Sequence, residues 1–330
     1  MASRTHDTNR SAATRLSRTA LDRTDPPRRP VGFYSKRVRS VVLAVDIGGT
    51  KLAAGLVDPA DGTLITRAAV PTPRSDDAEV VFAALLGLLD ALGPGRAAAE
   101  VCGIGSGGPM TAGGEALTPV HIPAWRGFPL RRRMAEATGL PVFVDNDAKA
   151  VALGEGWVGA AAGVGAYIGM VVSTGVGGGI VLDGRLLDGA AGNAGHIGHV
   201  IVRPGGRPCF CGGRGCLEGE ASGRAIEAIT GRAPAEAPPE VVERTGRLVG
   251  RAVASVANLL DLRLAVVAGS VALGFGAPFF AAAQAEIDAL SRLDFSRGAR
   301  IQPARMAGDA PLVGAAAVAL YRLGKLGCCP

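Results

Sequence analysis

Two stretches of the chain share one pattern, in which an apolar strand leads through a glycine turn into a second apolar strand. The first stretch covers residues 41–57 and the second covers residues 166–181. Glycine allows backbone N–H groups to converge on a phosphate without steric conflict. Either turn alone is weak evidence, because glycine hairpin turns without ligands are common. Together they predict two lobes of related design, each of which presents a glycine turn to one shared cleft.

The residues around the first turn suit phosphate and metal binding. Gly48 and Gly49 precede Thr50 and Lys51, which add a hydroxyl group and a positive charge. Asp46, at the end of the preceding apolar run, could hold Mg²⁺ through water. Neither turn has the spacing of a Walker A loop or of the dinucleotide-binding fingerprint. The pair therefore predicts a phosphate-binding cleft of a different kind.

Three polar residues, Asp145, Asn146 and Asp147, follow a short apolar run and precede a predicted helix. Asn and Asp are preferred helix caps, so one of the three is expected to cap this helix. The positive end of the helix dipole favours an ionised carboxylate at neutral pH. Because three polar residues exceed what a cap requires, we expect a carboxylate here that accepts a proton.

Residue types that bind metals are concentrated in the second half of the chain. His196 and His199 are followed closely by Cys209, Cys211 and Cys216. Three cysteines and one histidine make a complete tetrahedral zinc shell, with no position left for a reacting water. The sequence therefore predicts a structural zinc loop. The alternative is a glycine-rich loop of reduced cysteines that binds no metal.

The distribution of charge limits the class of protein. Residues 1–40 hold ten of the 35 Lys and Arg residues and three of the 29 Asp and Glu residues, so the other 290 residues carry 25 basic and 26 acidic side chains. The net positive charge belongs to this tail, which could bind nucleic acid or anionic lipid or have no defined role. For the rest of the chain, specific nucleic-acid binding is not expected, and the low aromatic content (4%) also argues against base stacking.

The six cysteines do not form the even framework of a small secreted domain. Three lie in the predicted zinc segment, Cys102 lies in an apolar run, and Cys328 and Cys329 lie at the end of the chain. The sequence also lacks the features of a signal peptide and an uninterrupted apolar run long enough to span a membrane. We therefore expect a cytoplasmic protein without a membrane partner.

The apolar patterns predict a mixed α/β protein with crossover helices. Strands are expected at 41–46, 52–57, 63–70, 101–105, 141–144, 166–172 and 264–268, and helices at 78–92, 130–138, 148–157, 221–230, 241–260, 279–290 and 312–323. Residues 1–40 have no apolar periodicity and are expected to form a disordered basic tail.

The first glycine turn, the Asn146-Asp147 pair, the second glycine turn and the histidine–cysteine segment occur in the order found in the ROK family of bacterial sugar kinases and sugar-responsive repressors. From about residue 41 to residue 323 the chain resembles that family. The resemblance implies a two-lobed α/β fold of the actin/hexokinase-like (ribonuclease H-like) kind with a structural zinc loop. The implied lobes are 41–155, completed by the C-terminal helix 311–326, and 156–310, which contains the zinc-binding segment 195–218.

The resemblance also implies a role for each motif residue, and Asp147 matches the catalytic base. Residues that match sugar-binding positions are Asn146, His196, His199, Glu218 and Gly108. Residues that match nucleotide-binding positions are Asp46, Gly48, Gly49, Thr50, Lys51, Thr174, Gly175, Gly177 and Gly269. The matching zinc ligands are His199, Cys209, Cys211 and Cys216.

The implied reaction is in-line transfer of the γ-phosphoryl group of ATP to a sugar hydroxyl, the 6-OH, with Mg²⁺ on the phosphates. Glucose and N-acetylmannosamine are the leading substrates, zinc would be structural, and the family suggests a homodimer or homotetramer. The alternatives are a ROK-type sugar-responsive transcriptional regulator and a non-catalytic sugar sensor. Residues 1–40 are too short for the DNA-binding domain of such a regulator, and the presence of Asp147 favours an enzyme.

Three positions depart from the pattern of many of these kinases. His196 stands where glucose-specific members usually have Glu, as it does in bacterial N-acetylmannosamine kinases, and an imidazole can donate a hydrogen bond where a carboxylate only accepts. The turn that matches the family's glycine-rich adenine-binding turn reads Ala268-Gly269-Ser270 in this chain. Lys149 replaces a second Asn, and we expect its side chain to face solvent.

Overall fold

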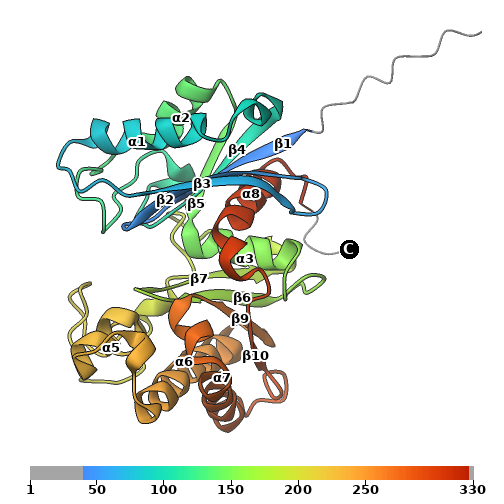
Figure 1. Ribbon diagram of the computed structural model, residues 1–330. Helices are drawn as coiled ribbons and strands as arrows, with labels where there is room; N and C mark the ends of the chain where they lie inside the picture. The colour runs from blue at the N-terminus through green and yellow to red at the C-terminus, as the bar shows by residue number, and fades with distance from the viewer. Residues whose placement is uncertain (1–39, 327–330) are drawn as a thin grey trace, which may run out of the picture. The chain divides into compact units, whose positions relative to one another are not determined.

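The structure is a computed structural model that describes residues 40–326, and within this range the chain forms two five-stranded sheets (Figure 1). The first sheet contains β1 (Val41–Ile47), β2 (Lys51–Val57), β3 (Leu64–Pro71), β4 (Ala99–Ser106) and β5 (Val142–Asn146). The second contains β6 (Tyr167–Val172), β7 (Val176–Leu182), β8 (Arg185–Leu186), β9 (Leu264–Ala268) and β10 (Arg300–Pro303). The expected disorder of the tail concerns residues outside the described range.

Helices connect and cover the strands. The α-helices are α1 (Ala78–Asp90), α2 (Leu130–Thr138), α3 (Asp147–Trp157), α4 (Leu217–Ala221), α5 (Gly223–Thr230), α6 (Pro239–Leu260), α7 (Ser270–Leu290) and α8 (Ala310–Arg322). Short 3₁₀ turns are η1 (Pro94–Ala98), η2 (Ala112–Gly114), η3 (Ile197–His199), η4 (Pro234–Glu236) and η5 (Ala307–Asp309). Among the described residues, no helix combines the length and apolar character that a bilayer crossing requires.

The two sheets have the same topology. In the first, β1 pairs antiparallel with β2 and parallel with β4, and the strand order is β3-β2-β1-β4-β5. In the second, β6 pairs antiparallel with β7 and parallel with β9, and the order from the other edge is β8-β7-β6-β9-β10. Each glycine turn joins the two antiparallel strands at the centre of its sheet. The repeated sequence pattern thus correctly predicted two sheets of related design.

The alternation of side chains along β1 shows how the layers form. Val41, Leu43 and Val45 belong to the core beneath α1 and α2, whereas Val42 and Ala44 belong to the core shared with α3 and α8. Figure 1 shows α1 and α2 on the outer side of the first sheet, with α3 and α8 between the two sheets. By the same alternation, Asp46 lies on the α3 side of β1, so its carboxylate faces the space between the sheets.

Close backbone contacts hold the middle layer together. A Cβ on Gly314 of α8 would lie 2.6 Å from the carbonyl oxygen of Ala150 in α3, and a Cβ on Gly103 of β4 would lie 1.9 Å from the carbonyl oxygen of Ala315. Such distances exclude any side chain larger than hydrogen at the two glycines. The crossing of α3 and α8 therefore depends on glycine.

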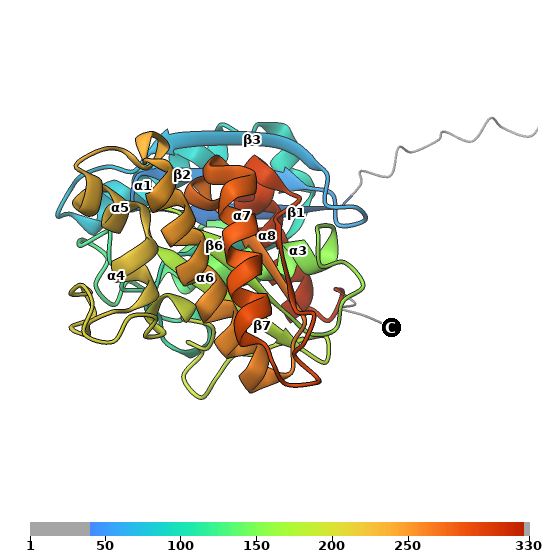
Figure 2. The ribbon, with the colours of Figure 1, turned by 90° about the horizontal axis from the view of Figure 1, so that it is seen from below.

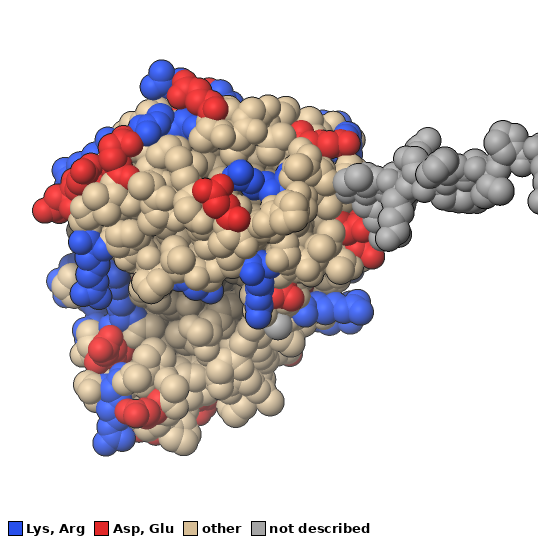
Figure 3. Space-filling model, turned by 45° about the horizontal axis from the view of Figure 1, so that its top comes forward, with Lys and Arg blue, Asp and Glu red and all other residues tan. Residues whose placement is uncertain are grey.

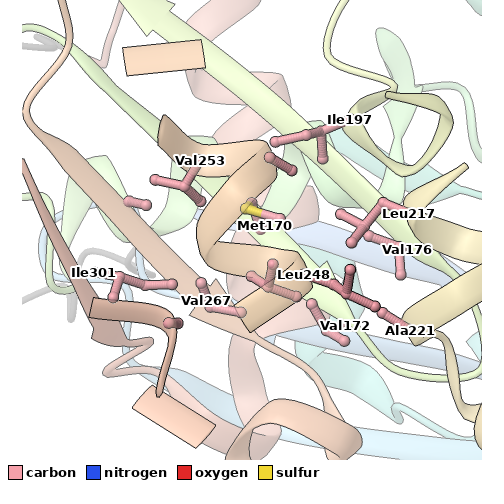
Figure 4. Packing of buried hydrophobic residues seen from close by; sticks show 14 of the residues in the cluster. Met170, Val172, Val176, Ile197, Leu217, Ala221, Leu248, Val253, Val267 and Ile301 are labelled. Atoms are coloured by element: carbon pink, nitrogen blue, oxygen red, sulfur yellow. The ribbon is translucent and has the colours of Figure 1, made fainter. Parts of the chain in front are cut away.

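The outer face of the second sheet packs on α6 and α7, which lie side by side (Figure 2). This packing buries a second large apolar cluster (Figure 4). Its members include Met170, Val172, Val176, Ile197, Leu217, Ala221, Leu248, Val253, Val267 and Ile301. Because α4 and η3 contribute residues to this cluster, the segment that carries the candidate zinc ligands is attached to the core.

The structure corrects three expected elements. Strand β10 was not predicted, because it has four residues, begins with a charged side chain and ends at Pro303, as suits an edge strand. The expected helix 221–230 begins at Gly223 as α5, since Ser222 ends the unpredicted helix α4 and caps α5 by accepting a hydrogen bond from the Ala225 N–H. Helix α7 begins at Ser270, with a break at Gly276 that hid its first part in the sequence pattern. The lobe boundaries given above stay a prediction.

Candidate active site

The first glycine turn joins β1 to β2. The Gly48 N–H donates to the carbonyl oxygen of Lys51 at 3.0 Å, and the Thr72 hydroxyl donates to the Gly48 carbonyl oxygen at 2.7 Å. Burial and, to a smaller extent, the charge of Asp147 raise the pKa of Asp46 to about 7, against the opposing charge of Lys51. A carboxyl group with this pKa becomes fully ionised when a cation is bound nearby.

Gly49 has a steric role in addition to its predicted role in phosphate binding. A Cβ at this position would lie 2.2 Å from the Cβ of His121, which belongs to the loop between β4 and α2. The loop therefore lies directly on the first turn. The carbonyl oxygen of Thr50, an exposed residue, accepts a hydrogen bond from the N–H of Thr72, the residue after the end of β3.

The Asn146-Asp147 pair begins α3, as predicted. The side chain of Asn146 caps the helix by accepting from the Ala148 N–H at 3.0 Å, and the Asp147 Oδ1 accepts from the same group at 2.8 Å. A Cβ on Gly108 would lie 3.6 Å from the Asn146 amide nitrogen, so these two predicted sugar-binding residues lie together. Asp46 and Asp147 are close enough for their charges to interact.

Asp147 begins α3, the helix between the two sheets, and its side chain is open to solvent although protein surrounds it on most sides. This environment raises the pKa of Asp147, mainly through desolvation, while the Ala148 N–H and the imidazoles of His196 and His121 lower it. The position of Asp147 at a helix N-terminus predicted only the contributions that lower its pKa and favour the ionised carboxylate. Figure 3 shows the surface hollowed across the middle of the molecule, with basic side chains at the rim.

The second glycine turn is tied to Glu218. The Glu218 Oε2 accepts a hydrogen bond from the Val176 N–H at 2.8 Å, and a Cβ on Gly175 would lie 3.0 Å from the same oxygen. Thr174, Gly175 and Glu218 line one cavity of about 210 Å³ with His121. The structure therefore brings a predicted sugar-binding carboxylate into contact with a predicted phosphate-binding turn.

Two other glycines assigned to nucleotide binding have packing reasons of their own. A Cβ on Gly177 would lie 2.9 Å from the Cβ of Ala148, so this glycine lets β7 approach the start of α3. Gly269 has a φ of 101°, and a Cβ there would lie 2.3 Å from the carbonyl oxygen of Val172. Their contacts with a nucleotide stay a prediction.

The ring of His196 is oriented by the backbone. Its Nδ1 lies 2.9 Å from the carbonyl oxygen of Asn193, which can only accept, so Nδ1 carries the proton. In the neutral imidazole, Nε2 is then an acceptor. In the neutral ring, the donor that an imidazole can offer in place of a carboxylate is therefore used by the backbone.

The four candidate zinc ligands lie together. The donor atoms of His199, Cys209, Cys211 and Cys216 are all within 4.8 Å of one another. The His199 Nδ1 is 3.8 Å from the Cys209 sulfur, and the sulfurs of Cys211 and Cys216 are 3.7 Å apart. A group of three thiols and one imidazole at these separations is compatible with zinc.

Sequence reasoning missed an ion-pair network behind the active site. Lys149 is buried, contrary to expectation, and its Nζ lies 2.8 Å from the Gly192 carbonyl oxygen and 3.3 Å from the Asp188 carboxylate. Arg322 of α8 binds both Asp188 and Asp145 at 2.8 Å. The network joins the end of β5, the start of α3, the loop after β8 and the end of α8.

Replacing Lys149 with Met is expected to lower the free energy of unfolding by roughly 3–5 kcal/mol, because buried acceptors lose their cation. Urea denaturation of the full chain measures the change. The matched control is Lys325→Met, which removes the same charge from an exposed position. Equal stabilities of the two variants would contradict a structural role for the buried lysine.

His121 is the second residue that the sequence reasoning missed. The chain contains four histidines, and this one lies in a loop without a recognisable motif, so its scarcity was the only signal. In the structure its Nδ1 lies 3.3 Å from the Arg224 Nη2 of α5. The pair connects the loop on the first turn with the helix next to the second turn.

The arrangement can be compared with known proteins. A ROK hexokinase from Thermus thermophilus superimposes with a TM-score of 0.75 at 35% identity, covering 86% of this chain and 99% of that chain. A ROK glucokinase from Streptomyces griseus, solved with glucose and AMPPNP, gives 0.74 at 30% identity, covering 86% of this chain and 100% of that chain. The architecture is thus the mixed α/β two-sheet fold of sugar kinases, which is actin/hexokinase-like.

The sequence comparisons lead to the same group. N-acetylmannosamine kinase of Escherichia fergusonii is 38% identical over 250 residues, which cover 71% of this chain and 84% of the relative. A model of the ROK family matches residues 42–322. The chain belongs to the ROK family.

Proposed function

We propose that this chain transfers the γ-phosphoryl group of ATP to a hydroxyl group, the 6-OH, of a hexose or N-acetylhexosamine. Its broader class is carbohydrate kinase, given the N-acetylmannosamine kinases and the glucokinase among its relatives. The observation that carries the proposal is the position of Asp147. This carboxylate begins α3, on the side of the first sheet that faces the second, close enough to Asp46 for their charges to interact.

Asp147 is the proposed general base. As the sugar oxygen attacks the γ-phosphorus, Asp147 takes the hydroxyl proton. The bond from phosphorus to the β–γ bridging oxygen breaks, and ADP leaves with that electron pair. Backbone N–H groups of the two glycine turns would hold the phosphates, so most of the rate gain comes from positioning and charge stabilisation.

Cations complete the proposed donor site. Asp46 would hold Mg²⁺ through water, and Lys51 and Thr50 lie in the same turn. Bound Mg²⁺ would neutralise charge on the phosphate oxygens. Because a nearby cation lowers a carboxyl pKa, loading the site would shift Asp46 from its value of about 7 into the ionised form.

Zinc has a structural role in this proposal. His199, Cys209, Cys211 and Cys216 would hold it through one nitrogen and three sulfurs, which leaves no open position for chemistry. The held segment carries His196 before the cluster and Glu218 after it. Fixing the cluster would therefore keep these two proposed sugar contacts in position.

The proposed sugar site favours N-acetylmannosamine or glucose as substrate. When its ring is neutral, His196 presents an acceptor at Nε2, as the Glu of glucose-specific members would, but without the charge. The N-acetylmannosamine kinases at 38% identity support N-acetylmannosamine as the substrate, and the glucokinase at 30% identity supports glucose. ATP as donor is supported by the AMPPNP complex of that glucokinase.

A coupled assay of ADP release with MgATP and four sugars tests the proposal. The sugars are glucose, mannose, N-acetylmannosamine and N-acetylglucosamine, and turnover is expected with N-acetylmannosamine or glucose. His196→Glu is expected to change the preference among them by roughly tenfold, since it changes one hydrogen-bonding group. Absence of ADP release with every sugar would contradict the kinase function and favour a non-catalytic sensor.

The regulator alternative is not favoured. The chain is 26% identical to a ROK family transcriptional regulator over 85% of its length, with a TM-score of 0.75, but covers 78% of that protein. The relatives at 38% identity are kinases. A homodimer or homotetramer remains part of the proposal, and light scattering of the purified chain would measure it.

A further inference from the structure

Arg224 extends from the first turn of α5 towards the opposite side of the site. Its Nη2 lies 3.3 Å from the Nδ1 of His121, a residue of the loop between β4 and α2. A guanidinium group only donates, so the His121 nitrogen must be unprotonated and accept the hydrogen bond. The direction of the arginine head group is therefore set by a residue about one hundred positions earlier in the chain.

His121 is itself held in position. Its Cβ packs on Gly49 of the first glycine turn, which has no room for a side chain. Burial lowers the pKa of His121, the charge of Arg224 lowers it further, and the carboxylates of Glu218 and Asp147 oppose these shifts. The imidazole thus stays neutral near pH 7 and keeps its acceptor for the arginine.

The guanidinium group of Arg224 forms no ion pair with a carboxylate in the part of the chain that the structure describes. Other arginines in the second half of the chain do form such pairs, for example Arg244 with Glu220 and Arg251 with Glu286. Arg224 instead lines the 210 Å³ cavity together with Thr174 and Gly175 of the second turn. Glu218 also lines this cavity, but one of its oxygens is occupied by the Val176 N–H.

We propose that Arg224 binds the phosphate end of the phosphoryl donor, and that His121 is the positioning residue that orients it. A planar guanidinium group is suited to two-point binding of phosphate oxygens. Arg224 lies beside the second glycine turn and is joined through His121 to the first, so it adds a positive charge where negative charge is transferred. The identity of the donor rests on the proposed kinase function, whereas the binding of phosphate by Arg224 does not.

Titration calorimetry on the full-length chain tests the proposal without turnover. The probes are MgATP, magnesium tripolyphosphate and the preferred sugar. Arg224→Met is expected to lower the affinity for both phosphate compounds by about 10- to 100-fold, the range for a charge-assisted hydrogen bond. Its affinity for the sugar should stay within about twofold of the wild-type value. The phosphate affinities of Arg224→Lys should lie between those of the wild-type chain and those of Arg224→Met, because lysine keeps the charge without the planar guanidinium group.

His121→Leu should lower the affinity for both phosphate probes less than Arg224→Met does. The double variant, with both substitutions, should bind these probes no more weakly than Arg224→Met alone. The matched control is Arg232→Met, which removes a charge from an exposed residue just beyond the other end of α5 and should leave all affinities unchanged. Phosphate affinities of Arg224→Met equal to this control would overturn the proposal, as would a wild-type chain that binds neither phosphate probe. Absence of sugar-dependent ADP release would contradict the kinase function, while the affinities would still decide the role of Arg224.

Discussion

Replacing Asp147 with Asn is expected to lower kcat by about 10²- to 10⁴-fold, because the variant cannot accept the hydroxyl proton. The fold should persist, since the Asn side-chain oxygen can accept from the Ala148 N–H as the carboxylate does. Sugar affinity, measured by calorimetry, should change by no more than a few fold. A steady-state assay of ADP release measures the loss.

Asp77→Asn is the matched control, because Asp77 also begins a helix and caps it with a carboxylate oxygen. Asn is an equally good cap, so this variant should retain wild-type activity. Undiminished turnover by Asp147→Asn would exclude the residue as the base.

The pH dependence of the wild-type chain provides a second measurement of the same carboxylate. Desolvation by the surrounding protein raises the pKa of Asp147, and burial together with the charge of Asp147 raises that of Asp46 to about 7. A carboxyl group with a raised pKa is protonated, and so unable to accept a proton, at a higher pH than usual. We therefore expect kcat/KM to decrease at a higher pH than the titration of an ordinary aspartate, near pH 4, would give, and a profile that decreases only near pH 4 would contradict this shift.

Replacing Cys216 with Ser is expected to remove the bound zinc and to lower the free energy of unfolding by about 4 kcal/mol or more. Burial raises the pKa of the Cys216 thiol to about 12, so this sulfur stays protonated in the metal-free chain. The zinc content measured by metal analysis should fall from about one zinc per chain to near zero. Activity should fall as well, because the segment that carries His196 and Glu218 loses the zinc that would hold it in position.

Cys102→Ala is the matched control, since Cys102 is buried in β4 at a distance from the cluster in sequence and has no metal ligand beside it in the chain. This variant should keep its zinc and most of its activity. A wild-type preparation that is free of metal and fully active would contradict the zinc proposal.

The fold could be predicted because its signals are local. Each glycine turn between two apolar strands is visible within about fifteen residues, and the cap at Asn146 follows from residue type alone. The candidate zinc ligands could also be recognised in the sequence, because Cys209, Cys211 and Cys216 lie within eight residues. These features do not depend on knowing which segments meet in space.

The missed residues depend on contacts between distant segments. Lys149 was expected in solvent because its position in the helix says nothing about Asp188, whose carboxylate lies 39 residues further on. Arg224 and His121 are separated by about one hundred residues, and neither lies in a motif. The orientation of His196 likewise follows from the Asn193 carbonyl group, which every residue type would provide.

The hydrogen bond from Val176 to Glu218 has a thermodynamic consequence. Because one carboxylate would contact the sugar while holding the second glycine turn, the two ligands are not expected to bind independently. Linkage requires that the factor by which sugar changes the affinity for the nucleotide equals the factor by which nucleotide changes the affinity for the sugar. A single side chain would thus make the enzyme respond to the presence of both substrates together.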